Sequence, residues 1–472
     1  MKKRKRKRRK QLILYWGMTL TAAAVLVVFV LCMVSFTNRK GKEEILPESF
    51  VSDAQREEDG KAGREEGDND TPLQERDPEM PENEEITKEP VLQPEDFEIT
   101  EPVVMAFGGD VCFHDEYANM HSLRSRGGKM ESSLSTDLLA EMKAADILMV
   151  NNEFAYSKRG TPLEGKAFAF RSRPENVDLL HEMGVDIVSL ANNHVYDWGE
   201  DALFDTLDTL KNAEIPYVGA GRNLDEAAAP FYYEVNGRTI AFISATQVER
   251  NENPDTRGAT EVTAGTFRCF TQEEFDRLLL VIREADANAD MTVVYIHWGT
   301  ENTDELHWAQ EWQAPEMVKA GADLIVGDHP HCLQGIDFID GVPVFYSIGN
   351  FWFNSKSLDT GILKVTLDEN GGVLCQFLPA LQHDCRTDLA SGAEKKRILD
   401  YLQCISPDVT IDENGVISDV PYSGPSIDYD AVERVPAPRE EPAVQQADPA
   451  VPPTESTAQP VKEEGIGETP ET

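Results

Sequence analysis

The chain has 472 residues, a formal net charge of −41 and a pI of about 4.5. So acidic a chain is not expected to present a basic surface for nucleic acid. Hydrophobic residues make up 40% of the sequence and concentrate between about residues 103 and 420, which indicates one sizeable folded region rather than two full cores. Much of the acidic charge lies in the flanking segments, so it describes solvated tails more than the folded region.

A membrane anchor is predicted at the N-terminus. Residues 1–11 are strongly basic, and residues 12–36 are an uncharged apolar stretch long enough to cross a bilayer. No small-x-small cleavage site follows, so we favour a retained anchor, with a cleaved signal peptide as the alternative. Since basic flanks stay in the cytoplasm, the localisation expected is a single-pass cell-membrane protein with its C-terminal domain extracytoplasmic.

Two segments flanking the folded region are expected to be disordered. Residues 37–100 form an acidic linker that holds the domain away from the membrane, and residues 426–472 form an acidic, Pro-rich tail. Neither buries enough apolar surface to offset the entropy cost of ordering. The folded domain is therefore predicted to span residues 101–425.

Apolar strands alternate with helices through this domain. The expected elements are, in order, strand 103–107, helix 138–145, strand 147–150, helix 177–183, strand 185–190, helix 200–212, strands 217–218 and 239–244, helix 273–285, strand 292–296, helix 308–319, strands 324–326 and 344–348, a hairpin of 361–367 with 373–378, and a helix near 393–404. The alternation predicts an α/β domain, with more than one sheet.

Polar side chains follow several of these strands directly. The ones that metal sites use are Asp110, Glu153, Asn193, His194, His297, His329 and His331. Each alone has an ordinary explanation, such as a helix cap, a turn or a core histidine. Together, carboxylates, an amide and imidazoles match a one- or two-metal hydrolytic site for Mn, Zn or Fe.

The cysteines do not add to this pattern. Outside the anchor there are six, with no CxxC pair and no zinc-finger spacing. Cys375 and Cys385 are close enough in sequence to pair, and an extracytoplasmic location would permit it, but free or buried thiols are an equal alternative.

The chain resembles the capsule-biosynthesis CapA family over roughly residues 103–380. The segments that carry the resemblance are Gly109-Asp110, Asn152-Glu153, Phe170-Arg171, Ala191-Asn-Asn-His194 with Asp197-x-Gly199, Gly219-Ala-Gly221, His297-Trp-Gly299 with Glu301, Gly327-Asp-His-Pro-His331 and Ser347-Ile-Gly-Asn-Phe351. The family is similar to calcineurin-like metallophosphoesterases. The resemblance therefore implies a metallophosphoesterase-like α-β-β-α sandwich, here preceded by a single transmembrane helix.

The resemblance also implies residue roles. Asp110, Glu153 (as the bridging carboxylate), Asn193, His297, His329 and His331 match metal ligands, and His194 matches the residue that contacts the transition state. Arg171 is expected to bind a carboxylate or phosphate of the substrate, with a plain surface arginine as the alternative. Glu301 is expected to act as a general base or to support a ligand, and a structural acid is the alternative.

One position departs from the phosphoesterase pattern. Those enzymes place a histidine two residues after the first aspartate, where this chain has Cys112. A thiolate can ligate zinc, but a buried thiol is the simpler interpretation, and His114 is a weaker substitute. The departure puts a full two-metal centre in question.

Three functions remain open at this point. The first is a metal-dependent, hydrolase-like protein in the synthesis or export of an anionic envelope polymer, poly-γ-glutamate, partnered by membrane synthase subunits. The second is a non-catalytic accessory subunit of such a synthase, which the cysteine at position 112 favours. The third, a general envelope metallophosphoesterase, follows from fold analogy alone.

Overall fold

A computed structural model describes residues 101–248, 257–429, 431–432 and 434–435. The expected basic segment, anchor and linker, and most of the expected tail, lie outside these residues. Within them, no helix is long and apolar enough to cross a membrane. The expected mixed α/β fold with more than one sheet is confirmed.

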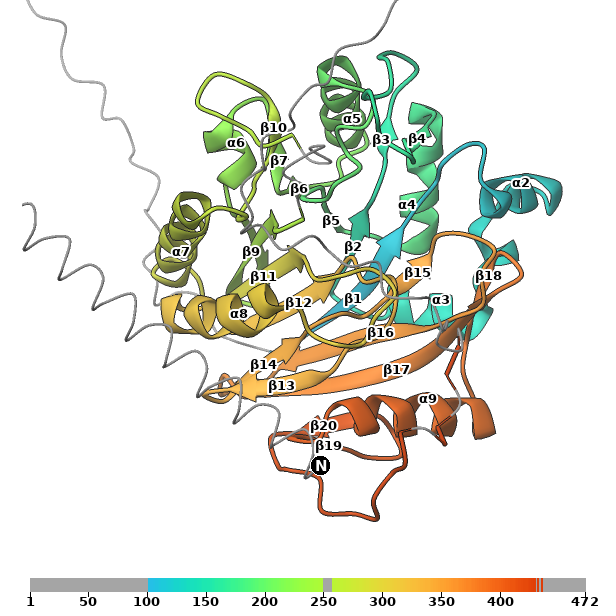
Figure 1. Cartoon of the computed structure of the whole chain (residues 1–472), viewed down its shortest axis with the longest axis vertical. Helices are drawn as coiled ribbons and strands as arrows, with labels where there is room; N and C mark the ends of the chain where they lie inside the picture. Colours follow the sequence, from blue (N-terminus) through green and yellow to red (C-terminus); the bar gives the residue numbers. More distant parts are fainter. Residues whose placement is uncertain (1–100, 249–256, 430, 433, 436–472) are drawn as a thin grey trace, which may run out of the picture. The chain divides into compact units, whose positions relative to one another are not determined.

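Ten strands form the first sheet (Figure 1). Its main order is β19-β20-β17-β16-β1-β2-β5-β6, with β15 beside β1 and β18 beside β17. The bounds are β1 Val103–Val111, β2 Ile147–Asn152, β5 Ile187–Ser189, β6 Tyr217–Val218, β15 Asn350–Trp352, β16 Leu358–Leu367, β17 Val373–His383, β18 Arg386–Leu389, β19 Thr410–Ile411 and β20 Val416–Ser418. Strands β1, β2, β5 and β6 run parallel, whereas the expected hairpin of β16 and β17 is antiparallel.

The second sheet has six strands in the order β13-β14-β12-β11-β9-β8. Its bounds are β8 Phe231–Val235, β9 Arg238–Thr246, β11 Met291–His297, β12 Leu324–Asp328, β13 Ile336–Ile339 and β14 Val342–Phe345. The four central strands are parallel, and the two edge strands are antiparallel to their neighbours. Two small strand pairs complete the topology: β3 Ala155–Tyr156 with β4 Arg171–Ser172, and β7 Ala220–Gly221 with β10 Gly265–Thr266.

Helices cover the outer faces of both sheets (Figure 1). The first sheet packs against α2 Ala118–Ser125, α3 Thr136–Lys143, α4 Asp178–Met183 and α5 Glu200–Asn212. The second packs against α6 Leu224–Ala228, α7 Gln272–Asp286 and α8 Trp308–Ala320. Helix α9, Gly392–Ile405, packs against the core between the sheets, and two 3₁₀ helices span Met130–Ser132 and Pro174–Val177. The layers therefore run helix, sheet, sheet, helix.

Alternation along the strands builds this layering. In β1, Met105 and Phe107 enter the core between the sheets, whereas Ala106 enters the core under the helices. In β11, Tyr295 faces the core between the sheets and Ile296 faces the outer helices. Because both faces of β1 and β11 are buried, the sequences of these two strands are continuous apolar runs rather than alternating ones.

The expected strand 344–348 is not continuous. Strand β14 ends at Phe345 in the second sheet, and the chain then crosses to the first sheet, where β15 pairs with β1. Two glycines permit the crossing: Gly349 has a φ of +74°, and a Cβ on Gly109 would lie 1.7 Å from the Gly349 carbonyl oxygen. The crossing places Asn350 beside Asp110.

The folded part continues beyond the expected boundary at residue 425. The Tyr429 hydroxyl donates to Asp304 at 2.6 Å, and the Val435 N–H donates to Asp359 at 3.0 Å. Tyr429 and Val432 also pack against the core between the sheets. Composition alone set the expected boundary, because this segment is polar and rich in Pro and acid.

Candidate metal centre

The site lies where the carboxyl ends of strands from both sheets meet. Strand β1 carries Asp110 and β2 leads into Glu153 in the first sheet, while β11 ends at His297 in the second. Strand β5 leads into the turn with Asn193 and His194, and β12 leads into the turn with His329 and His331. The six expected metal ligands all enter this region, and they come from two sheets rather than from one edge.

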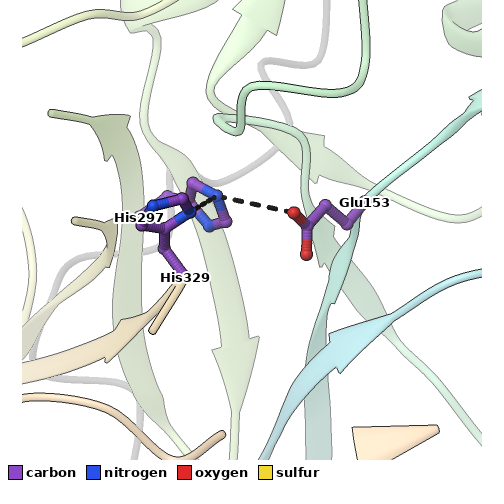
Figure 2. A group of neighbouring side chains, drawn as sticks. All are labelled: Glu153, His297 and His329. Carbon is purple, nitrogen blue, oxygen red and sulfur yellow. Dashed lines mark hydrogen bonds and ion pairs between the residues drawn. The ribbon is translucent and has the colours of Figure 1, made fainter. Parts of the chain in front are cut away.

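One group of donors consists of Glu153, His297 and His329, which face one another in Figure 2. His297 Nε2 lies 3.7 Å from Glu153 Oε1 and 3.1 Å from His329 Nδ1. Asn193 Oδ1 lies 2.9 Å from the same His297 nitrogen. Donors about 2.0–2.2 Å from one cation lie roughly 3.0–3.6 Å from each other, so this spacing suits a transition metal.

Three further groups of donors adjoin the first. Their members are Asp110, Glu153 and His331; Glu301, His329 and His331; and Asp110, His297 and Asp328. Within the first of these, His331 Nδ1 lies 3.0 Å from Asp110 Oδ2, and Asn350 Oδ1 lies 2.8 Å from the same nitrogen. Glu153 belongs to two groups, as do Asp110, His297, His329 and His331, so the four groups form one connected cluster.

Buried polar atoms support a cation here. Both carboxylate oxygens of Glu153 and Oδ2 of Asp328 are buried without a hydrogen-bond partner in the described part of the chain. Burial, together with the neighbouring charge of Asp110, raises the pKa of both groups well above its ordinary value. Unpaired carboxylates in a dry interior are costly unless a cation compensates them, so the residues present fit a metal ion.

The surroundings of His297 also suit a metal ligand. Burial lowers its pKa to about 3, so the ring is neutral, and Nδ1 lies 2.7 Å from Asp328 Oδ1. With its proton on Nδ1, facing Asp328, the ring would present the Nε2 lone pair toward Glu153 and Asn193. A carboxylate behind a histidine fixes ring orientation in metal sites, and Asp328 is placed for that role.

His331 and Asp110 form an interacting pair. Burial alone would lower the pKa of His331, but its bond to Asp110 raises it above the ordinary value. In return, burial would raise the pKa of Asp110, but His331 holds it well below the ordinary range. The turn that presents the histidines is strained, since His329 has a φ of 90° and His331 a φ of 56°.

His194 lies beside these groups, and its ring is held in place by Asp197 and Phe170. Its Nδ1 lies 2.7 Å from Asp197 Oδ2, and its Nε2 lies 3.8 Å from Glu153 Oε1. Lys166 forms an ion pair with Asp197 and donates to the Asn193 carbonyl oxygen. Phe170 stacks on the imidazole at 4.1 Å between ring centroids. Burial lowers the pKa of His194, although Asp197 opposes the change.

Arg171 and Glu301 occupy different surroundings. The Arg171 guanidinium stacks over Trp198, 3.6 Å from the ring centroid, and donates to the Arg159 carbonyl. Glu301 is exposed, but its carboxylate belongs to the group with His329 and His331.

The thiols stay out of the site. Cys112 is fully buried in the core under the helices, and burial raises its pKa well above the ordinary value, so it is a core thiol. His114 Nδ1 contacts the backbone of Arg171 instead of the donor groups. All six cysteines of the described part are free, so Cys375 and Cys385 do not pair there.

Four residues of the candidate site could not be assigned from the sequence. Asp328 lies within a recognised motif but received no role, and Asn350 follows a strand that was expected to be continuous. Asp197 also lies within a motif of the resemblance without an assigned role, although its carboxylate lies 2.7 Å from His194 Nδ1. Lys166 carries no sequence signal beyond its proximity to Phe170 and Arg171.

Comparisons with known proteins agree with the chain's own motifs. The family model "Bacterial capsule synthesis protein PGA_cap" matches residues 104–355. "Capsule biosynthesis protein CapA" of Bacillus anthracis is 32% identical over 241 residues, which is 48% of this chain and 55% of that protein. "PGA biosynthesis protein CapA" of Bacillus subtilis is 32% identical over 248 residues, which is 51% of this chain and 63% of that protein.

Two further matches are more distant. A "probable polyglutamine synthesis accessory protein" of Mycobacterium tuberculosis is 26% identical over 213 residues, covering 44% of this chain and 56% of that protein. A solved structure from Thermus thermophilus aligns with 58% of this chain and 99% of its own, at 10% identity and a TM-score of 0.33. The chain thus spans little more than half the length of the curated relatives it matches. Because the family model spans more than half of the sequence, the chain belongs to the bacterial capsule synthesis PGA_cap family.

Proposed function

We propose that this protein acts in the synthesis or export of poly-γ-glutamate through a metal-dependent, hydrolase-like site of the metallophosphoesterase type. Membership of the PGA_cap family and the printed names of the Bacillus relatives support the polymer. The observation that carries the site is Glu153, a buried carboxylate whose oxygens have no hydrogen-bond partner in the described part of the chain and which lies 3.7 Å from His297 Nε2. Its neighbours are of the kinds that bind Mn, Zn or Fe, as one or two ions.

The chemistry divides between the metal and the protein. A divalent cation held by Asp110, Glu153, Asn193, His297, His329 and His331 would supply Lewis-acid polarisation of the scissile phosphoester or amide. His194 supplies proton transfer: its Nδ1–H donates to Asp197, which leaves the Nε2 lone pair on the Glu153 side. A neutral, oriented imidazole of this kind suits general acid–base catalysis.

Substrate charge is the main physical objection, since the chain carries −41 and the polymer is also anionic. Cations at the centre and the buried ammonium of Lys166 would make the pocket locally positive. Arg171 is proposed to contribute at the rim, where Trp198 holds the guanidinium plane. Glu301, exposed and next to His329 and His331, is proposed as a general base or supporting ligand.

A membrane location is part of the proposal. Residues 12–36 would anchor the chain, residues 37–100 would tether the domain outside the cell, and membrane synthase subunits would be its partners. The support is the basic cluster before an uncharged apolar stretch. Protease treatment of intact spheroplasts tests this: we expect loss of the domain and protection of residues 1–36, and a protected domain would contradict it.

Turnover tests the proposed chemistry. The purified full chain, loaded with Mn²⁺ or Zn²⁺, is incubated with poly-γ-glutamate and, separately, with the phosphodiester bis-p-nitrophenyl phosphate, and polymer length and p-nitrophenol release are measured. We expect turnover that His194→Ala lowers by about 10²–10⁴-fold, the range of general acid–base catalysis. His181→Ala, an exposed histidine on α4, is the matched control and should keep full activity.

A second function is favoured by one relative, whose name includes "accessory protein". In that case the metal-loaded chain would bind poly-γ-glutamate without cleaving it. Absent turnover with retained polymer binding would replace the hydrolase-like proposal with this accessory role. Cleavage of the phosphodiester alone would favour a general envelope phosphoesterase.

A further inference from the structure

The C-terminal end of the described chain contacts a loop beside the metal centre. Asp304, in the loop between β11 and α8, accepts from the Tyr429 hydroxyl at 2.6 Å and from the Tyr401 hydroxyl at 3.2 Å. The Arg434 guanidinium lies 3.6 Å from the same carboxylate and 4.0 Å from the Tyr429 ring centroid. We call Tyr429, Arg434 and Val435 the C-terminal clasp.

The clasp is fastened to the body of the domain at its other end. The Asp359 N–H, on β16, donates to the Val435 carbonyl at 2.7 Å, and the Val435 N–H donates to the Asp359 carboxylate at 3.0 Å. Asp359 in turn forms an ion pair with Arg397 on α9. Because the Asp359 side chain is buried within the domain, these bonds hold Val435 against an ordered part of the fold.

The loop that the clasp holds also carries Glu301. Its backbone adjoins the histidine turn, because the Asn302 N–H donates to the Pro330 carbonyl at 2.8 Å. Gln334 Nε2 donates to the Thr303 carbonyl at 3.0 Å. Within the described ranges, no hydrogen bond or ion pair holds the Glu301 carboxylate itself. Its place near His329 and His331 therefore depends on the backbone of the loop.

We propose that the C-terminal clasp positions the 301–306 loop, and with it the Glu301 carboxylate, for a cation shared with His329 and His331. The proposal rests on the metal site of the proposed function. Asp304, Tyr429 and Arg434 are positioning residues, since they act through Glu301. The clasp lies beyond residue 355, where the family match ends, so it is a feature of this chain outside the matched region.

A double-mutant cycle in the full chain tests the proposal. Tyr429→Phe with Arg434→Met removes the clasp's bonds to Asp304 and keeps its bulk. We expect Mn²⁺ affinity, measured by calorimetry, to fall about ten-fold, at the lower end of the effect of residues that support metal ligands. We expect amide exchange of residues 301–306 to accelerate about ten-fold, because a loop that loses its contacts opens more often.

Glu301→Gln decides whether the effect passes through that carboxylate. In the Glu301→Gln background, the clasp substitutions should cause no further loss of Mn²⁺ affinity, while still accelerating loop exchange. Arg434→Lys, which keeps the charge, should recover part of the affinity. Tyr232→Phe, an exposed tyrosine on β8, is the matched control and should change neither quantity.

Two results would overturn the proposal. One is unchanged loop exchange in the clasp variant. The other is an equal loss of affinity with and without Glu301, which would make the clasp a general stabiliser of the fold. A wild-type chain that binds no Mn²⁺ would count against the proposed function and against a cation at Glu301. In that case loop exchange would still decide whether the clasp holds the loop.

Discussion

The interior between the two sheets is apolar along most of its length. It is rich in carboxylates only where the carboxyl ends of the parallel strands meet, which we call the anionic end. Phe242 and Met149 lie in the first region, Glu153 and Asp328 lie in the second, and all four are fully buried. Burial favours the first pair and opposes the second, because apolar groups gain from leaving water and unpaired carboxylates lose. The apolar core thus fixes the ends of the strands. These strand ends hold the carboxylates of Glu153 and Asp328 close together, against the cost of burying them.

The largest expected effect comes from breaking the apolar region. Phe242→Ala removes a fully buried ring between the sheets and should lower the free energy of unfolding by about 3–5 kcal/mol, measured by urea denaturation. Phe168→Ala, at a phenylalanine that is 63% exposed, should change it by less than about 0.5 kcal/mol. Equal effects at the two sites would mean that the sheets do not share a packed interior.

Substitutions at the anionic end should lower metal affinity rather than the free energy of unfolding. Asp328→Asn keeps the size of the side chain but weakens the hold on His297 Nδ1, so Mn²⁺ affinity should fall about 10–100-fold by calorimetry. Asp419→Asn, an exposed aspartate after β20, should leave the affinity unchanged. Full affinity in Asp328→Asn would show that the Asp328 carboxylate does not orient a ligand.

Tyr295 marks the boundary between the two regions. Its ring packs between the sheets, and its hydroxyl donates to the Gly108 carbonyl at 2.8 Å. Tyr295→Phe should therefore cost about 1 kcal/mol of unfolding free energy, the net value of one hydrogen bond. A loss of more than about 3 kcal/mol would indicate that the hydroxyl supports the anionic end as well. Thermal denaturation with and without Mn²⁺ separates the two cases.

A half-buried carboxylate outside both regions should show the smallest effect. Burial would raise the pKa of Glu274, but bonds from the Thr271 backbone and from Arg268 outweigh it and hold the pKa below its ordinary value. Because the folded-state pKa is the lower one, this contribution is present at neutral pH and is lost as the pH falls below about 4.3, the ordinary glutamate value. Glu274→Gln should cost up to about 1 kcal/mol at about pH 7. The difference from wild type should shrink as the pH falls below about 4.3, and a difference that grows toward low pH would contradict the direction of this pKa shift.

Much of the fold, and most of the side chains that meet at the candidate site, could be predicted from the sequence. A strand buried on both faces reads as an apolar run, and its end is marked by the first polar residue, which is how Asp110, Glu153 and His297 could be found. The roles of Asp328 and Asn350 could not. They depend on which strands are neighbours and on a crossing between sheets, and neither follows from the order of residues in the chain.

The contacts beyond residue 425 could not be predicted for a related reason. Residues near Tyr429 are polar and rich in Pro and acid, which is typical of disordered chain. Their partners, Asp304 and Asp359, lie far away in sequence. Long-range contacts of this kind leave no local pattern, so composition gives no sign of them.

We propose that the carboxylate-rich end of the interior holds divalent cations through Glu153. The direct measurement is metal content by mass spectrometry of the full chain after loading with Mn²⁺ and removal of free metal, for wild type and Glu153→Gln. We predict one or two ions per wild-type chain and loss of bound metal in Glu153→Gln, with both proteins folded by circular dichroism. A folded wild-type chain without metal, or a Glu153→Gln chain that keeps its full complement, would contradict the account.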